Sequence, residues 1–177
     1  MRVFITGGTG LVGRRLIARL RERQDQPVIL SRKRAKAQAR LGPDVEIVEG
    51  DPTTGGDWMK AVGSCDAVVI LAGENVFAGR WNAEFKDKIR DSRVQGTKNI
   101  VGAIARAENK PSVLVNASAV GYYGPHGDEE LTEDSPHGDD FLAGACVEWE
   151  DAARAVEATG VRLVIARIGV VMSTAEG

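Results

Sequence analysis

The sequence predicts an α/β fold, a doubly wound parallel sheet with helices on both faces. Three observations support this prediction. Short apolar runs rich in Val and Ile recur along the chain, segments with helical spacing lie between them, and a glycine-rich turn joins the first run to the first helix. Continuous apolar runs suit strands buried on both faces, and strict alternation of strands and helices implies a parallel sheet. We expect one domain over residues 1–177.

Six apolar runs are the expected strands, and they read RVFIT, PVILS, VEIVE, AVVILA, SVLVNAS and RLVIARIGVV. Helical spacing of apolar residues predicts helices over about 11–20, 83–107 and 139–158. The last of these ends at Gly160, a natural helix stop. Between the last two helices, residues 125–140 carry seven carboxylates and show neither pattern. This segment is either a solvated loop or a loop over the carboxyl ends of the strands, where open α/β sheets bind ligands.

Composition excludes several classes of partner. Apolar residues make up 43% of the chain, and 23 Lys and Arg nearly balance 25 Asp and Glu, giving a net charge of -2. There is no electrostatic reason to expect nucleic acid or an anionic membrane, and the longest apolar run is too short to cross a bilayer. Cys65 and Cys146 are expected to be buried free thiols, which favours a reducing, cytoplasmic location. His126 and His137 lie in a loose context, so no metal site is expected.

The stretch FITGGTGLVGRRLIARL is a strand, a glycine turn and a helix in immediate succession. Gly7 permits the tight turn, Gly10 lets the backbone approach a pyrophosphate, and Gly13 lets the helix pack close to the strand. The helix amino terminus offers free N–H groups to the anion. This arrangement predicts a dinucleotide-binding Rossmann domain. Three further residues of the turn and helix start belong to the expected cofactor site: Thr9, Leu11 and Val12.

The end of the second strand indicates which dinucleotide binds. A site that prefers NAD usually places Asp or Glu here, to bind the ribose 2′-hydroxyl. Ser31, Arg32 and Lys33 instead offer a hydroxyl and two cations, which suit a 2′-phosphate. The sequence therefore favours NADP over NAD, although Arg32 and Lys33 could simply begin a solvated helix. Asp51, after the third strand, is either an acceptor for the adenine amino group or an ordinary loop aspartate.

Several motifs together resemble the extended short-chain dehydrogenase/reductase family, in its NAD-dependent epimerase/dehydratase branch. They are TGGTGLVG at the amino terminus, LAG at 71–73, VQGTKNIV at 94–101, ASAVGYYG at 117–124 and LTEDSP in the acidic loop. With FLAGACVEWE at 141–150, the sequence is similar to an atypical subgroup whose members are usually labelled only "epimerase family protein". Extended members carry a substrate lobe after the strand that matches RLVIARIGVV. The resemblance implies that this lobe is absent from the 177 residues.

The resemblance also implies roles for matching residues. Leu71, Ala72 and Gly73 are expected to run beneath the nicotinamide ribose. Ser118 matches the serine that hydrogen-bonds the reacting carbonyl or alcohol, and Tyr122 lies where the loop turns over the substrate. Arg167 falls where family members place the end of a strand against cofactor and substrate. Arg93 departs from the family pattern, because its position is often asparagine in the wider family.

The family's usual acid/base pair is missing. Active members carry Tyr-x-x-x-Lys after the acidic loop, because residues four apart share a helical face and the lysine can then lower the pKa of the tyrosine. In this chain those positions fall on Phe141 and Ala145. Together with Trp149 and Ala153 they form an apolar stripe, whose first interpretation is core packing and whose second is the helix face of a homodimer.

Two functions are open on the sequence alone. The first is an NADP-dependent oxidoreductase or epimerase-like enzyme with a replaced acid/base group and an unknown small-molecule substrate. In that interpretation Ser118 binds the substrate. Tyr122 is the first candidate for proton transfer, and Glu74 is the second. The second is a non-catalytic module that senses NADP(H) or supports a partner.

Overall fold

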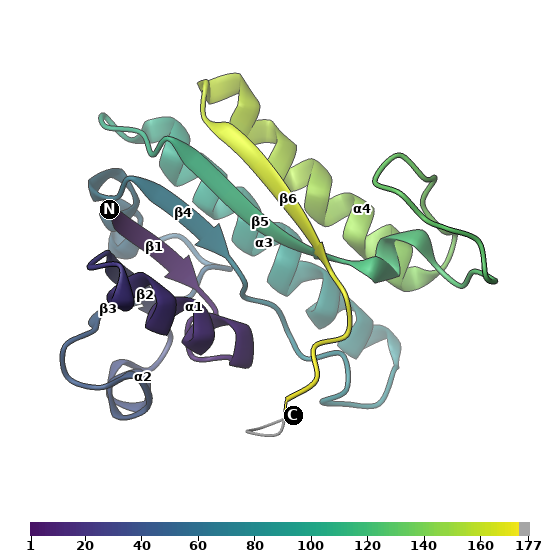
Figure 1. Cartoon of the computed structure of the whole chain (residues 1–177), viewed down its shortest axis with the longest axis horizontal. Helices are drawn as coiled ribbons and strands as arrows, with labels where there is room; N and C mark the ends of the chain where they lie inside the picture. The colour runs from purple at the N-terminus through teal and green to yellow at the C-terminus, as the bar shows by residue number, and fades with distance from the viewer. Residues whose placement is uncertain (174–177) are drawn as a thin grey trace.

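A computed structural model describes residues 1–173, and residues 174–177, the end of the predicted domain, lie outside the described residues. The strands form one parallel sheet in the order β3-β2-β1-β4-β5-β6 (Figure 1). Their bounds are β1 Arg2–Thr6, β2 Gln26–Ser31, β3 Glu46–Glu49, β4 Ala67–Ile70, β5 Val113–Ala119 and β6 Arg162–Ile168. The order reverses between β1 and β4, so the carboxyl ends of these two strands flank the crevice in which such sheets bind ligands.

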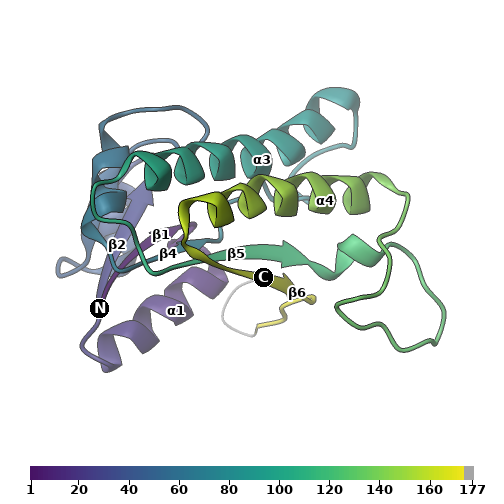
Figure 2. The ribbon, with the colours of Figure 1, turned by 90° about the horizontal axis from the view of Figure 1, so that it is seen from above.

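Helices cover both faces of the sheet, as predicted. Their bounds are α1 Leu11–Glu22, α2 Arg34–Leu41, α3 Ala83–Arg106 and α4 Phe141–Arg154, with short 3₁₀ segments η1 Asp57–Ser64, η2 Val120–Tyr123 and η3 Ala155–Thr159. The helices α3 and α4 lie on one face and α1 on the other (Figure 2). Two apolar clusters fill the layers between, one joining the sheet to α3, α4 and η1, the other joining it to α1 and α2.

The strands differ from the prediction only at their ends. The run AVVILA was expected to be strand throughout, but β4 stops at Ile70, and the next residues leave the sheet to cross the glycine turn. The last run stops at Ile168, because its pairing partner is Ala119 and β5 ends there. The chain after Gly160 turns as expected, since this glycine adopts a left-handed conformation with φ +81°.

The helix α2 was considered only as an alternative, in which Arg32 and Lys33 begin a solvated helix. Only Ala37 of its eight residues is buried, so the segment lacks the apolar stripe by which the other helices are found. Lys33 occupies the position before the first helical residue and makes no side-chain capping hydrogen bond.

The apolar stripe of α4 serves the core. Ala145, Trp149 and Ala153 are buried, and the Trp149 indole donates a hydrogen bond to Thr97 Oγ1 of α3 at 2.9 Å. The stripe is therefore occupied within the chain, and a homodimer through it is not supported. The two cysteines are buried free thiols, as expected. Within residues 1–173 no helix combines the length and apolarity needed to span a membrane.

Candidate functional site

The glycine turn has the close packing that its spacing predicts. Gly7 has φ +72°, and a Cβ there would lie 2.7–2.8 Å from the backbone of Leu71 and Ala72. A Cβ on Gly13 would lie 2.5–2.8 Å from backbone atoms of Gly7 and Gly8. Real Cβ atoms do not approach backbone so closely, so both positions require glycine. The backbone of Gly10 caps the amino end of α1, whose first N–H groups face the turn.

A pocket of about 670 Å³ lies over the carboxyl ends of β1, β2 and β4. Its volume is in the range of small-molecule and cofactor sites. Ten residues expected to bind the cofactor line it: Gly7, Thr9, Gly10, Ser31, Arg32, Lys33, Asp51, Leu71, Ala72 and Gly73. Leu11, Val12, Gly13 and Arg167 do not line it, although the first three form the start of the helix beside it.

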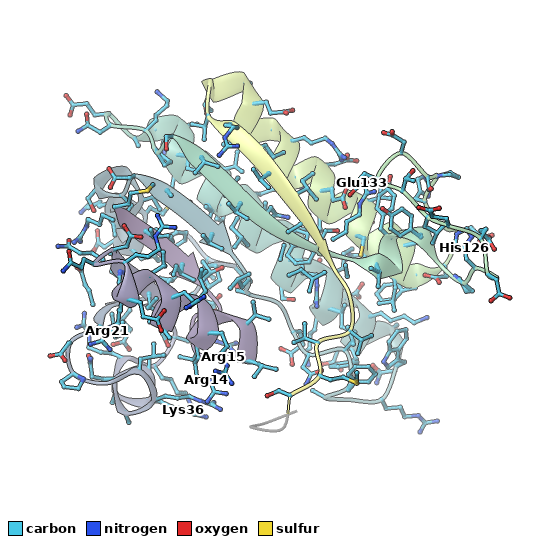
Figure 3. All side chains as sticks on the ribbon, in the orientation of Figure 1. Arg14, Arg15, Arg21, Lys36, His126 and Glu133 are labelled. Carbon is cyan, nitrogen blue, oxygen red and sulfur yellow. The ribbon has the colours of Figure 1, made fainter. Side chains whose placement is uncertain are left out.

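One end of this pocket is basic. Arg32 and Lys33 line it together with Lys36 and Arg40 of α2. Figure 3 shows Lys36 at the same side of the view as Arg14 and Arg15 of α1, away from the acidic loop. Among residues 1–173, Arg32, Lys33 and Lys36 have no carboxylate in ion-pair contact. Sequence reasoning missed Lys36 and Arg40 as pocket residues, because it considered a helix after Lys33 only as a solvated alternative and not as part of the site.

From the sequence, Arg32 and Lys33 either bind a 2′-phosphate or begin a solvated helix, and their positions in the structure are compatible with both. These residues lead into the helix α2 and also line the pocket. The Ser31 hydroxyl accepts a hydrogen bond from the Lys33 amide at 3.3 Å, which fixes the turn between β2 and α2. Asp51 also lines the pocket, and its Oδ1 accepts hydrogen bonds from the amide and the hydroxyl of Thr53 at 2.9 and 2.7 Å.

A second polar cluster lies where β5, β6 and α4 meet. The Ser118 hydroxyl donates a hydrogen bond to Glu150 Oε1 at 2.7 Å, and Glu150 is fully buried. Arg167 donates to both oxygens of that carboxylate at 2.9 Å, and Arg154 donates to Oε2 at 3.2 Å. Burial raises the pKa of Glu150, but the hydrogen bonds from Arg167 and Ser118 outweigh it and hold the pKa below its usual value. Glu150 was not found from the sequence, because Arg167 lies 17 residues further on.

The aromatic pair after β5 surrounds Arg167. The guanidinium lies 3.5 Å from the ring centroid of Tyr122 and donates a hydrogen bond to the Tyr123 hydroxyl at 2.9 Å. It also donates to the backbone carbonyl of Glu133, which brings the acidic loop over this end of the sheet. Tyr123 is buried and Tyr122 partly exposed. The substrate-binding role of Ser118 and the proton-transfer role of Tyr122 stay predictions, and Ser118 is only 3% exposed.

The two positions of the missing acid/base pair lie at the start of α4. The Phe141 ring packs edge-on against Trp81, with ring centroids 5.8 Å apart, and Lys86 Nζ lies 5.2 Å from its centroid. Ala145 is 5% exposed. Neither side chain can exchange a proton or carry a charge.

The fold and the pocket are those of dinucleotide-binding α/β proteins. The chain belongs to the NAD dependent epimerase/dehydratase family, whose model matches residues 3–174. An epimerase family protein of Mycobacterium bovis is 41% identical over 175 residues, covering 99% of this chain and 55% of the relative. An epimerase family protein of Bos taurus is 39% identical over 180 residues, covering 100% of this chain and 56% of the relative. The chain thus spans about half the length of the curated relatives it matches.

Solved structures agree with this assignment. The human epimerase family protein, crystallised with NADPH, superposes with a TM-score of 0.79 at 33% identity, over 100% of this chain and 56% of that one. A nucleoside-diphosphate sugar epimerase from Corynebacterium glutamicum gives a TM-score of 0.81 at 36% identity, over 100% of this chain and 35% of that one. The resemblance inferred from the motifs is therefore confirmed as family membership.

Proposed function

We propose that this chain binds NADP(H), with the adenosine 2′-phosphate at the basic end of the pocket. The observation that carries the proposal is the set of cations around the end of β2, of which Arg32, Lys33 and Lys36 have no carboxylate partner within residues 1–173. A phosphate dianion fits such a group, because charge-assisted hydrogen bonds to it replace water at each cation. Ser31 adds a hydroxyl where an NAD site would place a carboxylate.

The remaining pocket residues fit the rest of the dinucleotide. The amino end of α1 suits the pyrophosphate, because the glycine turn leaves its N–H groups open to an anion. Asp51 lies beside the adenine end, and the segment Leu71–Gly73 lines the opposite end, where the nicotinamide half would lie. When bound, the cofactor supplies a hydride donor or acceptor. A relative crystallised with NADPH supports the same choice.

Calorimetric titration of the chain with NADPH and NADH tests this proposal. One charge-assisted contact contributes about 1.5–3 kcal/mol, so we expect at least a roughly ten-fold preference for NADPH. Arg32→Ala and Lys36→Ala should each reduce the difference between the affinities for NADPH and NADH. Arg34→Ala is the matched control, because Arg34 is exposed on the same helix and does not line the pocket. Equal affinities, or tighter binding of NADH, would overturn the proposal.

We further propose that the whole protein is an oxidoreductase or epimerase-type enzyme, with a substrate lobe that follows these 177 residues. Its relatives are about twice as long as the matched region, which supports the lobe. Tyr122 is the first candidate for proton transfer, since its ring is partly exposed and stacks on Arg167. Ser118 is the candidate for substrate binding. Its hydroxyl proton is held by Glu150, so it could offer a substrate only a lone pair.

One observation favours the second candidate function, a non-catalytic NADP(H)-binding module. Phe141 and Ala145 are packed against neighbouring side chains and leave the usual proton donor unreplaced on α4. General acid–base groups contribute about 10²–10⁴-fold to rate, so turnover without them should be slow.

A carbonyl-substrate panel with NADPH, run on the full-length protein, separates the two functions. Turnover that falls in Tyr122→Phe and rises in Phe141→Tyr supports the enzyme. Ala145→Lys is a poor companion variant, because it places an unpaired charge at a buried position. Absence of turnover in all of these variants, with NADPH binding retained, supports the module. Brisk turnover that is indifferent to Tyr122→Phe and Ser118→Ala would mean that the catalytic site lies elsewhere.

A further inference from the structure

Arg93 of α3 lies behind the pocket at the end opposite to the basic residues. Its Nη1 donates hydrogen bonds to the backbone carbonyls of Glu74 at 3.1 Å and Ile89 at 2.9 Å. Its Cζ lies 5.4 Å from the ring centroid of Trp149. One half of the guanidinium is therefore fixed between the helix α3 and the segment that follows β4.

Gly73 is shaped to receive this guanidinium. A Cβ on Gly73 would lie 2.9 Å from Cζ, 3.1 Å from Nη2 and 3.2 Å from Nε of Arg93. The three distances are nearly equal, so the flat face of the guanidinium rests on the glycine. Gly73, Glu74 and the neighbouring Ser92 line the pocket. Arg93 thus supports this part of the pocket wall directly.

The guanidinium also has unused hydrogen-bonding capacity. Within residues 1–173, Nε and Nη2 of Arg93 have no hydrogen-bond partner, and no carboxylate forms an ion pair with it. Burial lowers the pKa of Arg93, and the nearby Cys146 and Glu74 offset this only in part. Arg93 is partly buried, and a cation removed from water without a counter-ion is costly unless a ligand or water completes its hydrogen bonds. By contrast, the Glu150 carboxylate accepts hydrogen bonds from Ser118, Arg154 and Arg167.

We propose that Arg93 is the positioning residue for the nicotinamide half of the dinucleotide. It holds the Gly73–Glu74 wall through Nη1 and presents Nε and Nη2 to an oxygen acceptor at that end of the pocket. It thereby supplies from α3 a positive charge that Ala145 cannot supply from α4. The inference rests on the proposed binding of NADP(H). It assigns Arg93 to the nicotinamide half of the cofactor, which lies away from the basic end of the pocket.

The test compares two probes, NADPH and adenosine 2′,5′-bisphosphate, which lacks the nicotinamide half. Arg93→Met keeps the length of the side chain and removes its donors. We expect it to weaken NADPH binding about ten-fold and to leave the bisphosphate affinity unchanged. Arg90→Met is the matched control, because Arg90 lies on the same helix and pairs with Asp87 and Asp91 at the surface. It should change neither affinity.

Thermal unfolding of each variant separates binding from folding. If Arg93→Met does not fold, Arg93→Lys is the alternative, because it retains the charge but cannot rest flat on Gly73. It should lower the ratio of NADPH affinity to bisphosphate affinity by less than the roughly ten-fold expected for Arg93→Met. A ratio that stays at the wild-type value in both variants overturns the inference, whatever the change in stability. Failure of the bisphosphate to bind the unmodified chain would instead overturn the proposed NADP(H) binding, so the two failures are distinguishable.

Discussion

The polar side chains at the two ends of the sheet edge differ in whether they have partners within the chain. At the β1–β2–α2 end, cations line an open pocket, and Arg32, Lys33 and Lys36 have no carboxylate partner within residues 1–173. At the β5–β6–α4 end, the polar groups bind one another, with Glu150 accepting from Ser118 and two arginines. Figure 3 shows the two ends far apart, with Lys36 at one and Glu133 and His126 on the acidic loop at the other.

This difference teaches how to separate binding groups from structural ones. Burying a polar group is costly unless its hydrogen bonds are made, so a fully satisfied buried cluster stabilises the fold and has little capacity left for a ligand. Exposed cations around a cavity keep that capacity. The family resemblance implied that Ser118 binds the substrate, and that role stays a prediction; in the structure its hydroxyl donates a hydrogen bond to Glu150.

The largest effect that would break this comparison concerns Glu150→Ala. Removing one partner of a buried ion pair leaves the other charge uncompensated, and this costs about 3–5 kcal/mol. We expect the free energy of unfolding, measured with denaturant, to fall by that amount. Glu148→Ala on the exposed face of the same helix is the control and should have little effect. A small loss for Glu150→Ala would show that the cluster is not structural.

Gly13→Ala tests the pocket end. The added Cβ would meet backbone atoms of Gly7 and Gly8 at 2.5–2.8 Å, so α1 must shift away from the turn. Overpacking of this kind costs about 1–3 kcal/mol. Because the shift also moves the amino end of α1, NADPH binding should weaken beyond what the lost stability explains. Calorimetry on the folded variant measures this, and undiminished affinity would mean that the turn does not cradle the cofactor.

The sequence predicted the fold and the pocket because their signals are local. Six apolar runs, helical spacing and glycines three residues apart require no knowledge of the tertiary structure. Lys36 could not be found in this way, because α2 buries one residue and its direction is set by the sheet beside it. Glu150 and Arg93 were missed as partners for a different reason. Their contacts join helices to segments 17 and 19 residues away, which periodicity does not reveal.

The buried carboxylate also predicts a pH dependence. The pKa of Glu150 is lower in the folded chain than its ordinary value, so its stabilisation is present above that ordinary value and is lost as the pH falls through the folded pKa. Each unit of lowering contributes about 1.4 kcal/mol. The free energy of unfolding should therefore decrease below about pH 4.5 more steeply in the unmodified chain than in Glu150→Gln. Parallel pH profiles for the two proteins would contradict this assignment.

The smallest expected effect is a gain in stability from Gly144→Ala, the same glycine-to-alanine substitution that should destabilise the chain at Gly13. Gly144 lies in the interior of α4 and is exposed, and a Cβ there would have no neighbouring atom within 4 Å, in contrast to Gly13 in α1. Glycine inside a helix is less favourable than alanine by about 0.5–1 kcal/mol, because it loses more conformational freedom on folding. Gly144→Ala should therefore stabilise the chain by that amount in denaturant titrations and leave NADPH affinity unchanged. Loss of stability would mean that the exposed face of α4 is covered in the whole protein or in an assembly, and the contrast between the two glycines would then no longer separate the two ends.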